Sequence, residues 1–158
     1  MADRSSAAIR IGGRLARADL PAFVAAIEIE GVSTDWDSEP FSIDELVEGQ
    51  PLYLVAHEVA GGMFDHLEDF CHRHGLPFAR WSAGCRGSYE PCRVVFDGAD
   101  YGDAFVANED DEVLISLEDI EKLGSMAAIR AYFAKANAAV PSLELIGDAP
   151  QTEETSHG

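Results

Sequence analysis

Two neighbouring side chains that transfer protons in many enzymes, His57 and Glu58, are the candidates for catalysis in this chain. A zinc-protease helix would place a second histidine one turn after His57, but Gly61 stands at that position. The surrounding residues favour a strand, in which neighbouring side chains point to opposite faces. We therefore expect no shared metal between them and assign no catalytic residue beyond these two candidates.

Alternation along this strand places Glu58 on the same face as Leu52 and Leu54, which we expect to be covered. A buried carboxylate needs a cationic partner or takes a raised pKa. Arg10, on the strand predicted to lie beside it, is the expected partner. An ion pair is thus the structural interpretation of Glu58, and a general acid or base is the functional one. If the alternation slips at the glycines, His57 takes the covered position instead.

Four potential zinc ligands, Cys71, His74, Cys85 and Cys92, are the candidates for a metal site. Their spacing matches no zinc module, and Cys71 lies on a predicted apolar helical stripe, which favours a small core residue. We assign no metal to the chain and expect no cofactor. The odd number of cysteines and the absence of an export signal argue against a disulfide framework.

The segment 85–92 has an unusual composition, because two thiols bracket Arg86, a glycine and Tyr89. Arg86 is a candidate for binding a small anion, and the two thiols are candidates for a reversible disulfide. An ordinary structural loop is the alternative. Neither Gly-Gly pair of the chain is followed by the lysine and hydroxyl residue of a phosphate-binding loop, which disfavours nucleotide hydrolysis.

Charge is the strongest compositional signal, because the 158 residues carry a net charge of −18. Such a surface repels nucleic acid, whose phosphates require cationic contacts, and attracts a basic protein surface. The segment 97–121 contains ten acidic and no basic residues. Within it, the predicted hairpin tip Glu109, Asp110, Asp111 and Glu112 is the candidate docking element for a basic partner. A solvated loop that prevents strand aggregation is the alternative.

The first half of the chain reads as two similar units, which predicts the fold. Each runs from a strand (7–11 and 52–59) through a Gly-Gly pair to a helix that ends at Gly31 or Gly75, and each then reaches a tryptophan. This order predicts a ferredoxin-like, duplicated β-α-β core. Its two first strands should lie side by side and parallel, so that both Gly-Gly turns meet at one end. The alternative is that all strand-turn-helix units resemble one another.

The second half predicts an antiparallel extension of this sheet. A strand at 94–96 is followed by hairpin arms at 103–107 and 112–116, then by a short helix capped by Ser116 and a further helix over about 125–138. Helical periodicity predicts that one stripe of each helix faces inward, namely Leu117, Ile120 and Leu123 in the first and Met126, Ile129, Phe133 and Ala136 in the second. A last strand covers 143–146. We expect one α+β domain over residues 1–147 and a disordered polar tail over 148–158.

Two functional hypotheses follow from these patterns. The first is a non-catalytic, acidic cytoplasmic protein that binds a protein partner with a basic surface, as an inhibitor or accessory factor of a nucleic-acid-handling machine. The second is a small enzyme or ligand-binding protein at the Gly-Gly turns that uses Glu58, His57 and the 85–92 loop. The chain has no membrane-spanning run and no signal-peptide pattern, and its arginine-rich composition is typical of GC-rich bacterial genomes. A homodimer through a sheet edge is a further possibility.

Overall fold

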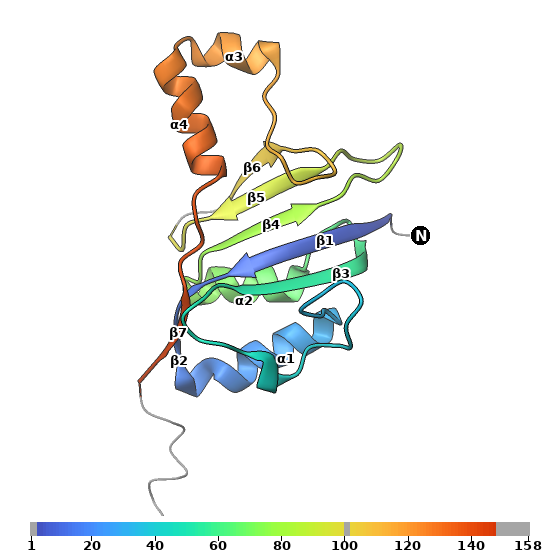
Figure 1. The fold of residues 1–158 in the computed structure, drawn as a ribbon, viewed down its shortest axis with the longest axis vertical. Helices are drawn as coiled ribbons and strands as arrows, with labels where there is room; N and C mark the ends of the chain where they lie inside the picture. The colour runs from blue at the N-terminus through green and yellow to red at the C-terminus, as the bar shows by residue number, and fades with distance from the viewer. Residues whose placement is uncertain (1–2, 100–101, 148–158) are drawn as a thin grey trace, which may run out of the picture.

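The computed structural model describes residues 3–99 and 102–147, and within them five strands form one antiparallel sheet in the order β3-β1-β4-β5-β6 (Figure 1). These strands are β1 (Arg4–Ile11), β3 (Leu52–Ala60), β4 (Phe78–Ser82), β5 (Cys92–Phe96) and β6 (Asp103–Val106). The short strands β2 (Gly13–Ala16) and β7 (Leu143–Ile146) form a parallel pair beside this sheet. The protein is therefore a mixed α+β fold, as predicted, with the predicted tail lying outside the described residues.

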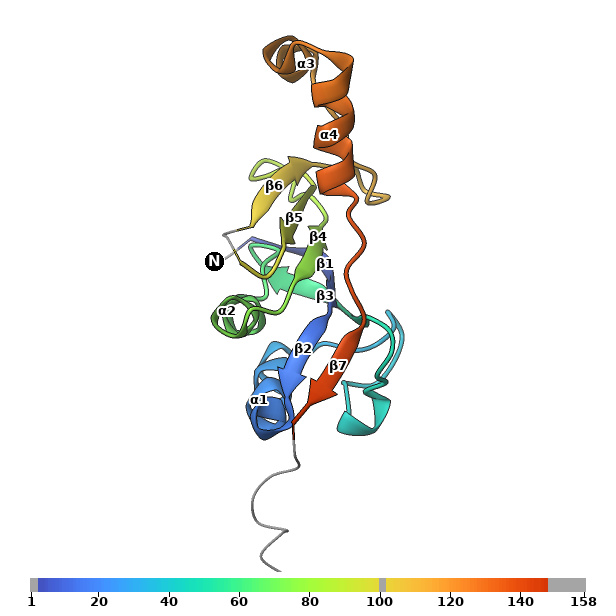
Figure 2. The ribbon, with the colours of Figure 1, turned by 90° about the vertical axis from the view of Figure 1, so that its left-hand side faces the viewer.

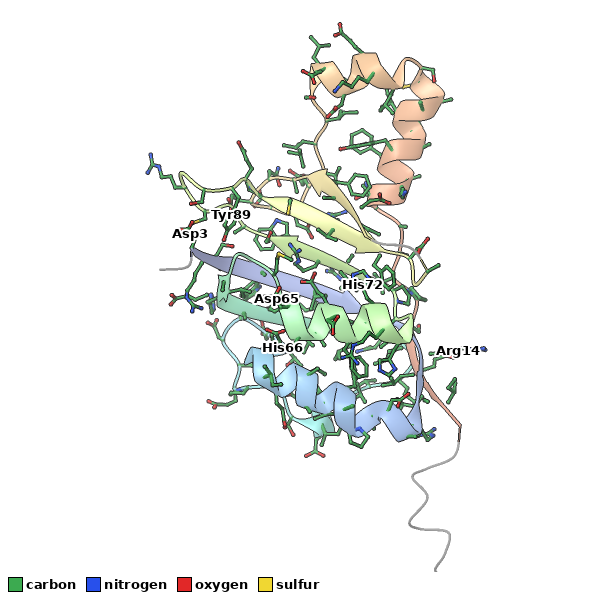
Figure 3. The ribbon with its side chains drawn as sticks, turned by 180° about the vertical axis from the view of Figure 1, so that it is seen from behind. Asp3, Arg14, Asp65, His66, His72 and Tyr89 are labelled. Carbon is green, nitrogen blue, oxygen red and sulfur yellow. The ribbon has the colours of Figure 1, made fainter. Side chains whose placement is uncertain are left out.

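Helices α1 (Leu20–Glu30) and α2 (Asp65–His74) lie together on one face of the sheet, as Figure 2 and Figure 3 show. The hydrophobic core fills the space between these helices and the strands. Its fully buried large side chains include Ile9, Ile11, Phe23, Ile27, Leu54, Leu67 and Phe78. Burying one such side chain contributes about 1.5–3 kcal/mol to folding, so this face supplies most of the hydrophobic stabilisation.

Both helices end where the sequence predicts. Gly31 and Gly75 adopt left-handed backbone angles (φ 67° and 66°), the conformation in which glycine terminates a helix without steric cost. The two helices are also joined end to end. The Glu30 carboxylate at the end of α1 accepts hydrogen bonds from the backbone N–H groups of His66 (2.8 Å) and Leu67 (3.0 Å) in the first turn of α2.

The prediction that β1 and β3 pair in parallel is wrong. They do lie side by side, but Ile11 pairs with Leu52 and Arg4 pairs with Ala60, which is the antiparallel register. The reason is the long connection 31–51, which returns the chain to the end of the sheet where β1 finishes. Within this segment, Ser33 exchanges backbone hydrogen bonds with Val55 of β3, and the Gly49 N–H donates to the Leu143 carbonyl of β7. Strand β3 therefore starts beside the last residue of β1 and runs antiparallel to it, whereas a crossover connection would have started β3 beside the first residue of β1.

The ferredoxin-like duplication is not confirmed. Trp81 lies in β4, but Trp36 lies in a turn, so the first unit has no matching final strand. Because β1 and β3 are antiparallel, their Gly-Gly turns lie at opposite ends of the sheet and do not meet. Gly12 is required by close approach, since a Cβ there would lie 1.7 Å from the carbonyl oxygen of Pro141. A Cβ at Gly61 would meet no atom within 4 Å, so glycine is favoured there by its φ of 63° rather than by lack of space.

The last two helices, α3 (Leu117–Leu123) and α4 (Met126–Ala136), project beyond the β6 end of the sheet (Figure 1). We name residues 117–136 the arm. The predicted cap is confirmed, because the Ser116 hydroxyl accepts a hydrogen bond from the Asp119 N–H (3.1 Å). The Ser125 hydroxyl caps α4 in the same way, through the Ala128 N–H (3.1 Å).

The predicted inward stripe of the arm is confirmed only in part. Ile120, Leu123, Ile129 and Phe133 are half-buried, but Leu117 is 70% exposed and Met126 is 59% exposed, and no layer of the described structure covers these two. Within the arm, which is described in full, Ala136 is the buried residue. No helix in the described parts of the chain combines the length and the apolarity needed to cross a membrane.

Candidate binding surface

The acidic hairpin tip is an ordered loop that hydrogen bonds hold in place. The side-chain carbonyl of Asn108 accepts hydrogen bonds from the N–H groups of Asp110 and Glu112 (both 2.9 Å). Its amide group donates to the Glu112 carboxylate (2.8 Å). Asp111 has a φ of 61°, a left-handed conformation that short polar side chains tolerate. The predicted turn 108–111 is thus confirmed. In place of the predicted second hairpin arm, 112–116, the structure has an isolated β-bridge between Ala107 and Val113.

Two of the four predicted docking carboxylates bond to residues outside the loop, and three of the four are exposed. Asp111 forms an ion pair with Arg93 of β5 (2.8 Å), and Glu109 accepts a hydrogen bond from the Gly84 N–H (3.1 Å). These two position the loop. Asp110 and Glu112 are exposed, and so is Glu109, so their charges remain accessible to a partner. Arg86 and Glu109 line the same open hollow of about 540 Å³, formed by residues 84–91, which brings two of the predicted binding residues together.

Arg93 is the residue that ties the loop and the arm to the sheet. Its guanidinium donates to the Asp111 carboxylate (2.9 Å), to the Ala136 carbonyl at the end of α4 (2.9 Å) and to the Asn137 side chain (2.6 Å). It also donates to the Asp111 backbone carbonyl. The side chain is only 13% exposed. One cation therefore bonds the hairpin loop and the carbonyl end of a helix, where the helix dipole favours positive charge.

A groove of about 470 Å³, which we name the arm groove, lies between β6 and the arm. It is lined by Asp103, Ala104 and Phe105 of β6 and by Leu123, Ala128, Ala131, Tyr132 and Lys135 of the arm. The rings of Phe105 and Tyr132 meet edge to face with centroids 5.2 Å apart. The Tyr132 hydroxyl donates to the Leu114 carbonyl (3.2 Å), and burial raises the pKa of this phenol. This groove was not predicted from the sequence.

The catalytic candidates His57 and Glu58 are both exposed, so neither interpretation of their burial is correct. Ser5 pairs with Val59 and Ala7 pairs with Ala56, which gives β3 one extra residue at this point. This β-bulge returns Val59 to the core and turns the two residues between it and Ala56 outward. The Nε2 of His57 donates to the Trp36 carbonyl (2.8 Å).

The predicted ion pair between Glu58 and Arg10 does not form. Arg10 instead places its guanidinium over the ring of Tyr53, 4.7 Å from the ring centroid. The backbone carbonyl of Glu58 accepts a hydrogen bond from the Arg4 side chain (3.1 Å). The two catalytic candidates lie on the β3 edge of the sheet and line a hollow of about 230 Å³ together with Glu30, Asp35 and Trp36.

The four metal candidates are spread over the molecule. Among residues 3–99 and 102–147, no three side chains of histidine, cysteine, aspartate or glutamate converge as metal ligands. Cys71 is fully buried in the core, and burial raises the pKa of its thiol. The His74 ring stacks on Phe70 with centroids 4.0 Å apart. Cys85 and Cys92 are free thiols in the 85–92 loop and at the start of β5.

A buried ion pair that sequence reasoning did not find lies under α2. The Arg80 guanidinium donates to the Glu68 carboxylate (2.9 Å), with side-chain exposures of 4% and 9%. Arg80 also contacts the Ser82 hydroxyl (3.3 Å) and the Cys92 sulfur (3.9 Å). Burial raises the pKa of the Glu68 carboxyl, and Arg80 and the Phe64 N–H oppose this shift. Glu68 lies on α2 between the core residues Leu67 and Cys71, and this position could have indicated a buried carboxylate.

Comparison of the chain with protein-family models, with curated protein sequences and with solved structures found no match. The function is therefore inferred from the geometry of the described surface.

Proposed function

We propose that this protein is a non-catalytic binding protein, and that its partner is a protein that presents a basic, amphipathic segment to the arm groove. The observation that supports the proposal is an uncovered apolar groove with acidic surroundings. Two-thirds or more of the side chain of Leu117 and more than half of that of Met126 are exposed on the same arm. Such a concentration of apolar surface is typical of an interaction site.

Charge complementarity selects the occupant. Helix α3 places Glu118 and Asp119 in its first turn, where Glu118 pairs with Lys122 (3.0 Å), and the hairpin loop that leads toward α3 carries the exposed Asp110 and Glu112. Lys135 pairs with Asp103 within the groove, so that its charge is compensated there. A segment with apolar side chains for the groove and lysine or arginine on its flanks matches both features. Steering by the net charge of −18 accelerates its association.

The partner class that fits best is a nucleic-acid-handling protein, because such proteins expose basic surfaces for phosphates. An acidic protein bound to that surface competes with the nucleic acid or delivers the protein to its site. The role is thus that of an inhibitor or accessory factor. The alternative, a catalytic or ligand site at the Gly-Gly turns, has less support. His57 and Glu58 line a hollow of about 230 Å³, but the His57 Nε2 is bonded to the Trp36 carbonyl and the two Gly-Gly turns lie at opposite ends of the sheet.

The test uses a matched pair of variants on α4. Ala131→Trp fills the arm groove, whereas Ala134→Trp adds the same bulk to an exposed position outside the lining. Tagged wild-type protein and both variants are incubated with nuclease-treated lysate of the source organism, and bound proteins are quantified by mass spectrometry. We expect a partner whose capture falls at least about tenfold with Ala131→Trp and is unchanged with Ala134→Trp, a difference of about 1.4 kcal/mol. Equal capture by both variants would overturn the groove assignment.

Charge is tested separately with the purified partner. The triple variant Glu109→Gln, Asp110→Asn, Glu112→Gln removes exposed charge and leaves the structural Asp111–Arg93 pair intact. We expect weaker binding, a slower association rate and a smaller salt dependence than in the wild-type protein. Binding that is insensitive to both salt and these substitutions contradicts a basic partner. If Ala131→Trp instead abolishes a dimer of the pure protein, the occupant is a second copy and the proposal fails.

A further inference from the structure

The face of the sheet opposite α1 and α2 contains a second hollow, which we name the open-face cavity. It has a volume of about 160 Å³. Its lining comes from the strands through Arg10, Ala79, Trp81 and Arg93, from the hairpin loop through Asp111, and from residues 136–140 after α4. Figure 2 shows this last segment passing along the sheet on the side away from α1 and α2. The cavity is independent of the arm groove and of the function proposed for it.

The strand register explains why a hollow exists at this place. Arg10 lies between Tyr53 on β3 and Ala79 on β4, and Ala8 lies beside Trp81 in the neighbouring row. Of the two alanines, Ala79 lines the cavity, and its side chain is short whereas those of Arg10, Trp81 and Arg93 are long. Residues on one face of a sheet stand side by side, so the large side chains form walls around an alanine floor.

Two arginines border the cavity, and they differ in their partners. Arg93 is fully engaged with Asp111, the Ala136 carbonyl and Asn137. Arg10 is exposed, and no carboxylate of the described residues lies within ion-pair distance of its guanidinium. The Tyr53 ring holds that guanidinium at 4.7 Å from the ring centroid. The Arg93–Asp111 pair is neutral, so Arg10 leaves the cavity with an uncompensated positive charge in a strongly acidic protein.

The remaining walls offer apolar contact. The Trp81 indole N–H is used by the Asn108 carbonyl (3.0 Å), so the ring presents its carbon surface. Ala79 and Val140 add apolar surface. An engineered cavity of about 150 Å³ is large enough to hold benzene, so this one accommodates a body of that size. A planar guanidinium at the mouth matches a carboxylate through two parallel hydrogen bonds.

We propose that the open-face cavity binds a small organic monocarboxylate of about the size of benzoate, with its carboxylate on Arg10 and its apolar body between Trp81, Ala79 and Val140. The uncompensated guanidinium selects the charge, and the alanine floor selects a small planar body. Burial raises the pKa of the neighbouring Tyr53 phenol, Arg10 opposes this shift, and Asp111 and Asp35 add to it. The phenol is therefore neutral at physiological pH and does not repel the carboxylate.

The probes are benzoate, its neutral analogue benzamide, and inorganic phosphate. Binding is measured by calorimetry and by amide chemical shifts on the full chain. We expect benzoate to shift the resonances of Ala79, Asn137 and the Trp81 indole, and to bind at least about tenfold more tightly than benzamide. Absence of binding at millimolar benzoate overturns the proposal. Binding of phosphate as tight as that of benzoate also overturns it, because the apolar body would then contribute nothing.

Matched arginine variants locate the binding. Arg10→Met keeps the length of an exposed side chain and removes its charge, and Arg10→Lys keeps the charge without the planar fork. Arg14→Met is the control, because Arg14 is exposed on β2 and points away from the sheet (Figure 3). We expect benzoate affinity to fall at least about tenfold in Arg10→Met, less in Arg10→Lys, and not at all in Arg14→Met. Equal losses in Arg10→Met and Arg14→Met would show binding through net charge alone and would overturn the site.

Discussion

The two sides of the sheet, the β3 side and the β6 side, are stabilised by different kinds of contact. On the side formed by β3, β1 and β4, helices α1 and α2 cover one face, and the space between is filled by fully buried side chains such as Phe23 and Leu67. On the β6 side, the arm projects from the sheet, and hydrogen bonds from Arg93 connect it to the body. The first arrangement buries apolar surface and supplies stability. The second leaves apolar surface exposed, which suits a segment that acts by binding.

Truncation of one large side chain on each side gives the largest contrast. Phe23→Ala removes a fully buried ring and should lower the free energy of unfolding by about 3–5 kcal/mol. Met126→Ala removes an exposed side chain of the arm and should change it by less than about 0.5 kcal/mol. Denaturant unfolding followed by circular dichroism measures both. Similar losses for the two variants would mean that the arm is packed as firmly as the core.

The buried pair under α2 gives an effect of similar or slightly smaller size. Arg80→Met leaves the Glu68 carboxylate without its partner and should cost about 3–5 kcal/mol at pH 7. The double variant Glu68→Leu, Arg80→Met removes both charges and should be more stable than Arg80→Met alone. If both variants unfold equally easily, the pair acts through side-chain packing rather than charge.

The loss of stability in Arg80→Met should also depend on pH. Burial already raises the pKa of Glu68 above its ordinary value of 4.5, and loss of the Arg80 charge raises it further. A carboxyl with a raised folded-state pKa contributes stability at low pH that is lost as the pH rises through that value. The deficit of Arg80→Met relative to the wild-type protein should therefore shrink as the pH falls toward 4.5. A deficit that does not vary with pH contradicts an unpaired buried carboxylate.

Loss of the Arg93 connection should have a moderate and local effect. Arg93→Met removes hydrogen bonds to Asp111, Ala136 and Asn137 and should lower the free energy of unfolding by about 1–3 kcal/mol. Hydrogen exchange should increase in residues 108–113 and in α4, with little change in α1. Exchange that increases evenly over the chain would show that Arg93 supports the whole fold rather than the arm.

The smallest effect concerns the unmodified protein. The arm buries few side chains, so its amides should exchange through local opening, with protection at least about tenfold lower than in α1 and α2. Native-state hydrogen exchange with peptide resolution measures this difference. Binding of the partner at the arm groove should remove it, because the bound segment covers the helices. Equal protection in the free protein would contradict the contrast between the two sides.

Local features of this chain could be predicted well because their causes are local. The helix ends at Gly31 and Gly75 follow from the left-handed conformation that glycine adopts at low cost. The cap by Ser116 follows from a hydroxyl placed three residues before a backbone donor. The adjacency of β1 and β3 was expected from the duplicated β-α-β model and is correct, although that model is not confirmed. Their direction could not be predicted, because it depends on where the connection 31–51 delivers the chain.

The candidate site was predictable only in part. The acidic turn at 108–111 was expected from its composition, but the structural role of Asp111 depends on Arg93, which lies 18 residues earlier in the chain. The exposure of His57 and Glu58 results from a bulge against β1, which shifts the alternation of a strand by one residue. A pattern with a period of two residues cannot reveal such a shift from one strand alone.

The sequence by itself determined the α+β composition, the helix ends, the capped turns and the strongly acidic surface, because each depends on residues within one or two turns or on simple sums of charge. The tertiary structure alone decided the antiparallel register, the buried Glu68–Arg80 pair, the hollow over Ala79 and the exposure of the arm. Each of these depends on which segments distant in the chain meet. An apolar helical stripe predicts that something covers it, and only the fold shows that, in the arm, Leu117 and Met126 are left exposed.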